Sequence, residues 1–350
     1  MAEPTSDDAA AARPTLSAVA QHANVSLATA SKVLNGRNGV GEQTRRRVQQ
    51  VIDDLGYVSP GSRPHREPDH DRWLQVIVDT LDNPYSSTLV AGIIDAAERA
   101  DTLVVTRRIA AVNELAARQW ADRLAATGCV GVVEVTSEVS SKRLAALRRV
   151  GCPLVVIDPV NAPATELNSV GATNWKGGKA AAEHLLELGH QHIHYVGGPG
   201  GSVSDQARVH GYWAAMRAAG VEVDLHAIPH GPFSYEQGLR AGGDVLDSTD
   251  RPTAIFAGCD AIAMGVFEAA RKRGVRIPDE LSVVGFDDTV LAHSSTPRLT
   301  TVRQPLTQMG AMAMRMIDAL YAGEEPESRQ VELATQLVVR DSTAPLDVRV

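Results

Sequence analysis

Three short helical patterns lie between residues 15 and 55, and a turn separates the first two. Thr15 can cap the first helix and Ser26 can cap a second one over residues 27–34, because a hydroxyl oxygen accepts hydrogen bonds from the free N–H groups of a first helical turn. Asn24 tolerates the left-handed backbone conformation that a tight turn requires. This order of cap, helix, turn, cap and helix predicts a helix-turn-helix unit, whose second helix normally enters the DNA major groove.

The distribution of charge supports a local nucleic-acid contact. The net charge of −8 argues against a protein that coats nucleic acid generally. Between residues 13 and 66, however, eight basic residues face only three acidic ones. A basic patch on an otherwise acidic chain is typical of one DNA-binding domain within a larger protein.

The length of the chain and the distribution of its apolar residues limit the number of domains and the kinds of segment to expect. A chain of 350 residues exceeds what one hydrophobic core holds, so two or three domains are expected. No segment approaches the roughly 20 apolar residues of a membrane span, and residues 1–12 are acidic and alanine-rich, unlike a signal peptide. The three scattered cysteines Cys129, Cys152 and Cys259 suit reduced thiols. We therefore expect a cytoplasmic protein without a membrane partner.

From Trp73 onward, short apolar runs alternate with helical patterns. The alternation predicts parallel sheets covered by helices on both faces, and two such runs predict two α/β subdomains. The cleft between them is the expected ligand site, with contacts from loops at the carboxyl ends of the strands. The expected buried strands are residues 74–78, 103–106, 130–135, 154–157, 192–197, 254–257 and 282–286, and the expected helices are residues 89–100, 115–126, 142–149, 175–188, 207–219 and 262–273.

An ordered set of motifs extends from about Thr15 to about Thr343 and resembles the lactose-repressor (LacI/GalR) family of transcriptional regulators. The motifs are Leu16–Ala20, Val25–Asn35, Leu55–Tyr57, Glu183–Leu185, Leu188–His190, Pro252–Phe256, Leu281–Asp288 and Leu299–Pro305. The resemblance implies an all-α helix-turn-helix head and an α/β core of two doubly wound parallel-sheet subdomains, as in the periplasmic sugar-binding proteins. It also implies a homodimer, a near-palindromic double-stranded DNA operator and a small-molecule effector.

These observations predict the following domains. A disordered tail is expected over residues 1–12, a helix-turn-helix domain over 13–59, a linker over 60–72 and a ligand-binding and dimerisation core over 73–345. Within the core, the N-terminal subdomain is expected at about 73–171 and 303–333, and the C-terminal subdomain at about 172–302 and 334–345.

The resemblance assigns DNA contacts to nine residues of the head. Leu27, Ala28 and Lys32 fall at base-contacting positions. Apolar side chains can meet thymine methyl groups but form no bidentate hydrogen bonds, so Lys32 supplies the main polar contact. The remaining expected DNA contacts are Ser26, Thr29 and Asn35 at phosphates, together with Thr15, Leu16 and Ser31.

The linker departs from the family pattern. Members of the family usually carry a short hinge helix whose leucine wedges into the minor groove. Here three prolines occupy residues 60–68, and a proline inside a helix costs about 3 kcal/mol. We expect instead an extended basic linker whose Arg63 and Arg66 enter a narrow minor groove or contact phosphates.

The core carries an expected ligand set that is suited to a polyol. Arg208 and Asp287 can donate and accept paired hydrogen bonds, and Phe233 can offer a flat apolar face. Phe233 could equally be a core residue, and Asp260 stands at the front of an expected helix, where capping alone would explain it. The full expected set is Asn83, Tyr85, Ser86, Leu89, Asp158, Ser204, Arg208, Phe233, Asp260 and Asp287.

Other chemistry is disfavoured by spacing. The four histidines between residues 184 and 194 span a helix end, a turn and a strand, which favours structural roles over a metal site. The glycine-rich stretch at 197–202 lacks the Lys-Ser/Thr pair of a P-loop, and it is expected to be a strand-to-helix turn that lines the cleft. No G-x-S-x-G elbow is present. We expect no cofactor, no metal and no enzymatic activity.

Three functions stay open. The leading hypothesis is a repressor that a mono- or oligosaccharide releases from its operator. The second is a corepressor system that responds to a purine or another metabolite. A purine site would need a further arginine near Ser202, and the sequence has no arginine there. The third is a cytoplasmic sugar-binding protein or enzyme with a non-functional head, and the intact capping of the basic head argues against it.

Overall fold

The computed structural model describes residues 15–34, 39–55, 72–108, 114–138, 140–161 and 167–346. The chain divides into two compact units, Met1–Asp69 and His70–Val350, and each is described by itself. The tail expected at residues 1–12 lies outside the described residues, as do Asn35, Arg63 and Arg66.

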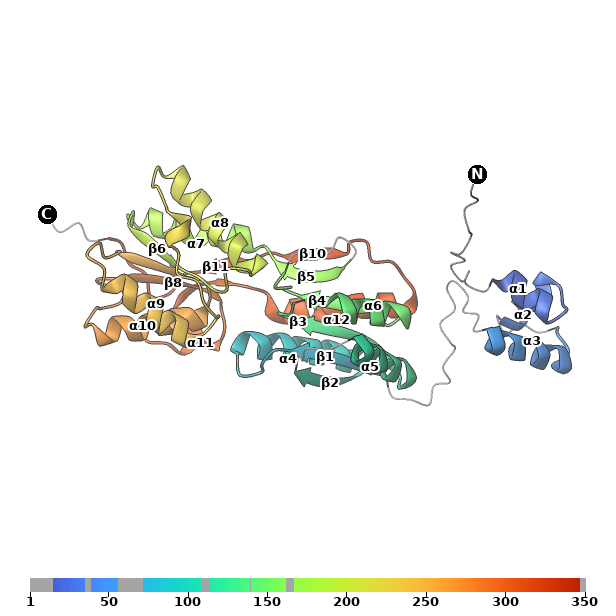
Figure 1. Cartoon of the computed structure of the whole chain (residues 1–350). Coiled ribbons are helices and arrows are strands. Elements are labelled where there is room, and N and C mark those ends of the chain that lie inside the picture. Colours follow the sequence, from blue (N-terminus) through green and yellow to red (C-terminus); the bar gives the residue numbers. More distant parts are fainter. Residues whose placement is uncertain are drawn as a thin grey trace, which may run out of the picture. The chain divides into compact units, whose positions relative to one another are not determined.

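The head consists of three helices around a small apolar core (Figure 1). They are α1 (Leu16–His22), α2 (Leu27–Leu34) and α3 (Glu42–Leu55). The expected caps are confirmed, since Ala18 N–H donates to Oγ1 of Thr15 (3.2 Å) and Thr29 N–H donates to Oγ of Ser26 (3.1 Å). Asn24 has a φ of +49°, as the turn requires. Among the residues at the centre of this core are Val19, Ala20, Ala23, Ala30, Val33, Val48 and Ile52.

The first sheet of the core belongs to the N-terminal subdomain and has the strand order β10-β5-β4-β3-β1-β2, with every pairing parallel. Its strands are β1 (Trp73–Val78), β2 (Leu103–Arg108), β3 (Cys129–Val135), β4 (Leu154–Ile157), β5 (Asn168–Ala172) and β10 (Gln330–Leu333). Helices α4 (Pro84–Arg99) and α12 (Leu306–Ala322) cover one face, and α5 (Glu114–Ala126) and α6 (Ser141–Arg149) cover the other. Successive residues of β1 point to opposite faces, as a strand requires: Val76 packs in the first cluster and Ile77 in the second.

The second sheet belongs to the C-terminal subdomain and has the order β11-β9-β8-β7-β6. Its strands are β6 (Ile193–Val196), β7 (Ala254–Ala257), β8 (Ser282–Asp287), β9 (Thr300–Arg303) and β11 (Gln336–Val338). Its helical elements are α7 (Asn174–Glu187), α8 (Val203–Ala218), η1 (Leu225–Ala227), α9 (Tyr235–Leu246), α10 (Asp260–Lys272) and α11 (Val290–Ser294). Helices α7 and α8 cover one face, and α9 and α10 cover the other (Figure 1). These two layered sheets, together with the helical head, confirm the predicted fold class.

The chain crosses between the two sheets three times: from β5 to α7, from β9 to α12 and from β10 to β11. One backbone hydrogen bond also joins the subdomains directly, since Val203 N–H at the start of α8 donates to the carbonyl of Val160 after β4 (3.1 Å). The loops after β4 and β6 therefore meet at the boundary between the subdomains, where the cleft was expected.

Two expectations about strands are wrong. The segment 103–106 was expected to be buried, but β2 is an edge strand, and the side chains of Leu103 and Val105 are 60% and 46% exposed. The sheets were expected to be parallel, but β11 pairs antiparallel with β9. An apolar run identifies a strand without telling whether a neighbour covers it.

Several elements were not expected at all: β5, β9, β10, β11, α9 and α11. The five other than α9 span five residues or fewer, and segments this short carry little periodicity. Helix α4 also begins at Pro84, five residues before its expected start, because Asn83 caps it and proline suits a first helical position.

Candidate functional site

The head presents one free face of α2. Ala30 and Val33 of this helix pack into the head's core, which turns Leu27, Ala28 and Lys32 outward. Leu27 is 54% exposed although it is a large apolar residue. An exposed leucine beside a lysine on a short helix fits the predicted base-contacting face.

The residues around this face have mixed roles. Oγ of Ser26 lies 2.9 Å from Oγ1 of Thr29, so the two predicted phosphate contacts are already tied to each other and to the cap of α2. Leu16 is half-buried against the head's core and supports α1 from inside. Thr15 is exposed and caps α1. The DNA contacts of these residues stay predictions.

In the core, the predicted Arg208 lies at the centre of a buried polar cluster. Its side chain comes from α8 and the residue is 3% exposed. Its Nε donates to Oδ1 of Asn174 (2.8 Å), and its Nη1 donates to the carbonyl of Gly258 (2.7 Å) and lies 3.8 Å from Oδ1 of Asp287. Three segments of the C-terminal subdomain therefore fix the guanidinium group in place.

Two aromatic rings flank this guanidinium. Its central carbon lies 3.9 Å from the ring centroid of Phe286 and 5.7 Å from that of Phe233. Both distances fall within the range of cation–π contacts. Phe286 is fully buried, whereas Phe233 is half-buried and packs at the edge of the core cluster. Phe233 thus packs against the core, as one reading of the sequence expected, and its contact with a ligand stays a prediction.

The N-terminal subdomain adds Tyr85 and Asp158. The hydroxyl of Tyr85 donates to Oδ2 of Asp158, and Asn83 holds this tyrosine's backbone through the cap of α4, because its Oδ1 accepts from Tyr85 N–H (2.9 Å). Ser86 directly follows Tyr85, and Leu89 lies about one turn further into α4; both are buried, and Leu89 belongs to the hydrophobic core. Leu89 therefore has a packing role in the structure.

Two strand ends place carboxylates toward the cluster through unusual backbone conformations. Asp158 follows β4 with a φ of +44°, and Asp287 ends β8 with a φ of +116°. Oδ1 of Asp287 accepts a hydrogen bond from Nε2 of Gln304 (2.7 Å). Residues held in such sparsely populated conformations often belong to functional sites.

The carboxylate of Asp260 has hydrogen-bond partners within the protein. Its residue is fully buried; Oδ2 accepts from the N–H and hydroxyl of Thr289 (2.7 and 2.9 Å), and Oδ1 accepts from the hydroxyl of Thr301 (2.6 Å). The cap of α10 is Cys259, whose Sγ accepts from Ile262 N–H (3.5 Å). The capping explanation for Asp260 is thus wrong, and its carboxylate ties the turn after β8 to β9.

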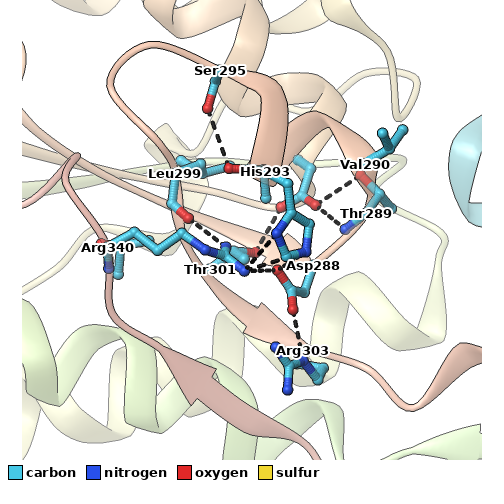
Figure 2. A network of polar contacts seen from close by, with 12 residues as sticks. Asp288, Thr289, Val290, His293, Ser295, Leu299, Thr301, Arg303 and Arg340 are labelled. Atoms are coloured by element: carbon cyan, nitrogen blue, oxygen red, sulfur yellow. Dashed lines mark hydrogen bonds and ion pairs between the residues drawn. The ribbon is translucent and has the colours of Figure 1, made fainter.

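The neighbouring Asp288 holds the same turn through ion pairs (Figure 2). It accepts from Nε of Arg303 (2.6 Å) and Nη2 of Arg340 (2.5 Å), and Nε2 of His293 lies 3.4 Å from it. Arg303 ends β9 just before the chain crosses to α12, and Arg340 follows β11. The ion pairs join the carboxyl end of β8 to the end of β9, where the chain crosses to α12, and to the segment after β11.

The cluster around Arg208 contains more carboxyl groups than cations. Burial raises the pKa of Asp158 and Asp205, raises that of Asp260 to about 7, and raises that of Asp287 to about 8, while Arg208 opposes the rise at Asp287. One guanidinium thus faces several buried acids, some of which hold a proton near neutral pH. Such a site offers several hydrogen-bond donors and acceptors around one guanidinium.

A cavity of about 650 Å³ opens beside this cluster, between the two subdomains. Asp158 and Ser204 of the predicted ligand set line it, from opposite subdomains. Beyond them it is bordered by the starts of α7 and α8 and by β10. Ligand cavities in proteins are commonly 300–1,000 Å³.

Four residues of the cluster were not among the predicted contacts: Asn174, Asp205, Phe286 and Gln304. Phe286 and Gln304 stand inside the quoted motifs, next to Asp287 and Arg303, so the motifs could have suggested them. Asn174 had no such neighbour in the motifs. Its role depends on α7 and α8 packing closely enough for its amide to reach Arg208, which needs the fold.

Two of the four histidines and the glycine-rich stretch have structural roles. Nε2 of His184 lies 3.0 Å from the hydroxyl of Thr343, and Nδ1 of His190 lies 2.9 Å from that of Thr253, so both histidines have structural partners. Residues 197–202 form the predicted turn between β6 and α8, with Ser202 capping α8. Within the described ranges, no group of three His, Cys, Asp or Glu side chains is arranged to hold a metal ion.

Comparison with protein families gives two matches. Residues 15–59 match the family described as bacterial regulatory proteins, lacI family. Residues 182–343 match the periplasmic binding protein-like domain.

Individual relatives match almost the whole chain. The HTH-type transcriptional regulator DegA of Bacillus subtilis (strain 168) is 32% identical over 96% of this chain and 99% of its own length. The regulator CelR of Thermobifida fusca is 30% identical over 94% and 98%. A solved CelR–cellobiose complex has a TM-score of 0.69 at 29% identity and covers 94% of this chain and 100% of its own. A lac repressor dimer bound to operator and the anti-inducer ONPF has a TM-score of 0.68 at 25% identity and covers 95% and 99%.

Proposed function

Because this chain belongs to the lacI family of bacterial regulatory proteins and is a DNA-binding transcriptional regulator, not an enzyme, we propose that it is a repressor released from its operator by an uncharged saccharide. The observation that supports the effector class most directly is the cluster at Arg208. It offers one fixed guanidinium, several carboxyl groups and two flanking aromatic rings.

The proposed ligand contacts follow from that cluster. Arg208 and Asp287 bind neighbouring hydroxyl groups, Phe233 stacks on an apolar sugar face, and Tyr85 and Asp158 contact the sugar from the N-terminal subdomain. Asn83, Ser86 and Ser204 complete the proposed set. Asp260 and Leu89 are left out, because internal contacts already use both side chains.

A phosphorylated or acidic sugar suits this site poorly. A ligand anion would add a charge to a group of buried acids that has one arginine to neutralise it. The solved relative bound to cellobiose, an uncharged disaccharide, is consistent with an effector of this kind.

Each part of the chain has its own proposed role. Residues 13–59 bind DNA, residues 60–72 connect this head to the core, and residues 73–345 bind the effector and form a cytoplasmic homodimer. No helix of the described part is long and apolar enough to cross a membrane. The exposed edge strand β2, with Leu103 and Val105, and the exposed Ile94 on α4 supply an apolar dimer face.

Effector binding acts through the boundary between subdomains. The hydrogen bond from Val203 to Val160 and the crossover residue Gln304, which bonds Asp287, both connect the cleft to that boundary. A saccharide that binds one arrangement of the subdomains better shifts the population toward it and changes the spacing of the two heads. In the linker, Arg63 and Arg66 are proposed minor-groove or phosphate contacts.

The test uses purified full-length protein and the DNA upstream of its own coding sequence. Fluorescence anisotropy should show binding of this DNA at nanomolar protein, and a panel of neutral sugars should contain one that raises the melting temperature and releases the DNA. Glucose 6-phosphate and glucuronic acid should do neither. DNA release by an acidic sugar, or tighter DNA binding with a purine, would refute the proposal.

The linker is tested separately. The double variant Arg63→Ala/Arg66→Ala should bind operator more weakly, and its affinity should fall less steeply with salt, by about 0.9 in the log–log slope for each phosphate that the linker no longer neutralises. Lys142→Ala/Lys272→Ala, which removes two exposed charges from the core, serves as the control. An unchanged slope would make the linker only a tether.

A further inference from the structure

The cavity between the subdomains adjoins the Arg208 cluster at Asp158 and Asn174 and also exposes an indole ring. Trp175 is the second residue of α7, lines this cavity and is 44% exposed. Its ring belongs to none of the hydrophobic clusters and makes no aromatic or cation–π contact with another described residue. A tryptophan left open beside a ligand cavity is a candidate binding surface.

The backbone under this ring is held rigidly. The neighbouring Asn174 is buried, donates from Nδ2 to the carbonyl of Ala172 (3.0 Å) and accepts from Arg208. The carbonyl of Trp175 itself lies so close to Gly211 of α8 that a Cβ there would come within 2.1 Å of it. The packing of α7 against α8 therefore fixes the base of the indole at the mouth of the cavity.

The rest of the outer cavity is polar. Gln330 and Glu332 of β10 are exposed and border it from the N-terminal subdomain, and Lys176 lies beside Trp175. An apolar ring bordered by donors and acceptors is the combination that sugar rings require, because their faces are apolar and their edges carry hydroxyl groups. Asp158 and Ser204 connect this outer part to the inner cluster, since both line the same cavity.

We propose that Trp175 and the outer cavity form a second saccharide subsite, so that the effector is an oligosaccharide of at least two units. The first unit occupies the Arg208 cluster, and the second stacks on the indole with its hydroxyl groups toward Gln330 and Glu332. This inference rests on the proposed saccharide effector and adds the length of the ligand to it.

The test compares matched monosaccharides and disaccharides on the full-length protein by isothermal titration calorimetry. The probes are glucose with cellobiose, xylose with xylobiose, and galactose with lactose. In the pair that binds, the disaccharide should bind at least tenfold more tightly than its monosaccharide. Trp175→Ala should bring the two affinities within about threefold of each other by weakening the disaccharide, and Trp175→Phe should keep most of the difference.

Trp213→Phe is the matched control, because it removes an indole from α8 at a position that does not line the cavity. It should leave both affinities unchanged. Equal binding of a monosaccharide and its disaccharide to the unaltered protein would overturn the subsite while leaving the saccharide proposal intact. So would an equal loss of both ligands in Trp175→Ala. If none of the six sugars binds the unaltered protein, the subsite as proposed and the saccharide effector class both fail.

Discussion

The head and the cleft place their functional side chains in opposite environments. In the head, Leu27, Ala28 and Lys32 are exposed, and the residues that hold α2 in place are different ones, Ala30 and Val33. In the cleft, Arg208 and Asp287 are buried and are held by neighbours that also hold the fold. In α2, the residues proposed to contact DNA are therefore not the ones that hold the helix in place, whereas in the cleft the same residues are proposed to bind the ligand and also hold the fold.

This difference matches what each region is proposed to bind. DNA is a large polyanion that a small domain can meet on an open surface, where contacts are added one at a time. A saccharide must be surrounded, because each of its hydroxyl groups competes with water for a partner. The cleft therefore needs polar groups that are fixed before the ligand arrives, and fixing them requires burial.

Replacing Arg208 should give the largest effect and tests the coupling directly. Arg208→Ala should abolish DNA release by the effector and also lower the free energy of unfolding of the core by about 3 kcal/mol. This is the lower end of the usual cost of breaking a buried ion pair, because Asp287 can stay protonated. Urea unfolding measures the stability.

The exposed Arg276→Ala is the control for Arg208→Ala, since its ion pairs with Asp279 and Glu280 lie at the surface. It should change the stability by well under 1 kcal/mol. If Arg208→Ala loses the response to the effector at full stability, function and folding are separable in the cleft after all, and the contrast with the head disappears.

Lys32→Ala should weaken DNA binding without changing the stability of the head. Operator affinity should fall by about 1–3 kcal/mol, the usual value of one polar contact to a base. The melting temperature should not change, because Lys32 is exposed and packs against nothing in the head's core. Lys142→Ala, an exposed lysine on α6, controls for the removal of one positive charge. A lower melting temperature in Lys32→Ala would show that the head, too, joins the two roles.

The sequence predicted the head more fully than the cleft, and the same contrast explains why. Helix α1 begins directly after its expected cap, and α2 spans its expected residues 27–34, because caps, turn and apolar spacing are all local. The strands and helices of the core were mostly expected from periodicity, but β5 and β9–β11 were not. These strands are short, and long-range pairing decides where they lie.

The candidate site divides in the same way. Tyr85, Asp158, Arg208 and Asp287 were expected from the family resemblance, and the structure brings them together. Asn174 and Gln304, which orient Arg208 and Asp287, act across 34 and 17 residues of sequence. These separations in sequence are far longer than one helical turn or one strand repeat, so no local sequence pattern could connect these residues. The burial that raises the pKa of Asp287 is likewise a property of the folded core.

The buried acids should make the stability of the core depend on pH. The pKa of Asp287 is raised to about 8 in the folded core, by burial first, whereas an unfolded aspartate titrates near 4. The folded state thus holds a proton that the unfolded state has released between about pH 4 and pH 8. Stability falls as the pH rises through this window, by at most about 1.4 kcal/mol per pH unit for one such group, and is flat above it.

Asp287→Asn isolates this contribution. The groups around Asp287 include Arg208, Asp158, Asp260 and Gln304, and Asp260 keeps its own raised pKa of about 7. The melting temperature of the core between pH 5.5 and 8.5 should therefore decline less steeply in Asp287→Asn than in the unaltered protein, without becoming flat. Asp341→Asn, at an exposed carboxylate, should leave the slope unchanged. Parallel curves for Asp287→Asn and the unaltered protein would mean that Asp287 is ionised in the folded core.

The smallest expected effect concerns Thr15, which caps α1 and is also a predicted DNA contact. Thr15→Ala removes the cap of α1 and should destabilise the head by about 1 kcal/mol, which faster amide hydrogen exchange in α1 would report. Thr15→Ser keeps the oxygen that accepts from Ala18 and should restore the protection. If the predicted DNA contact also exists and uses the hydroxyl, Thr15→Ser should restore operator affinity as well. A weaker affinity in Thr15→Ser with full protection would place the contact on the methyl group. Thr15 would then serve stability and DNA binding through different atoms, whereas in α2 different residues have these two roles: Leu27, Ala28 and Lys32 are exposed, and Ala30 and Val33 pack inside.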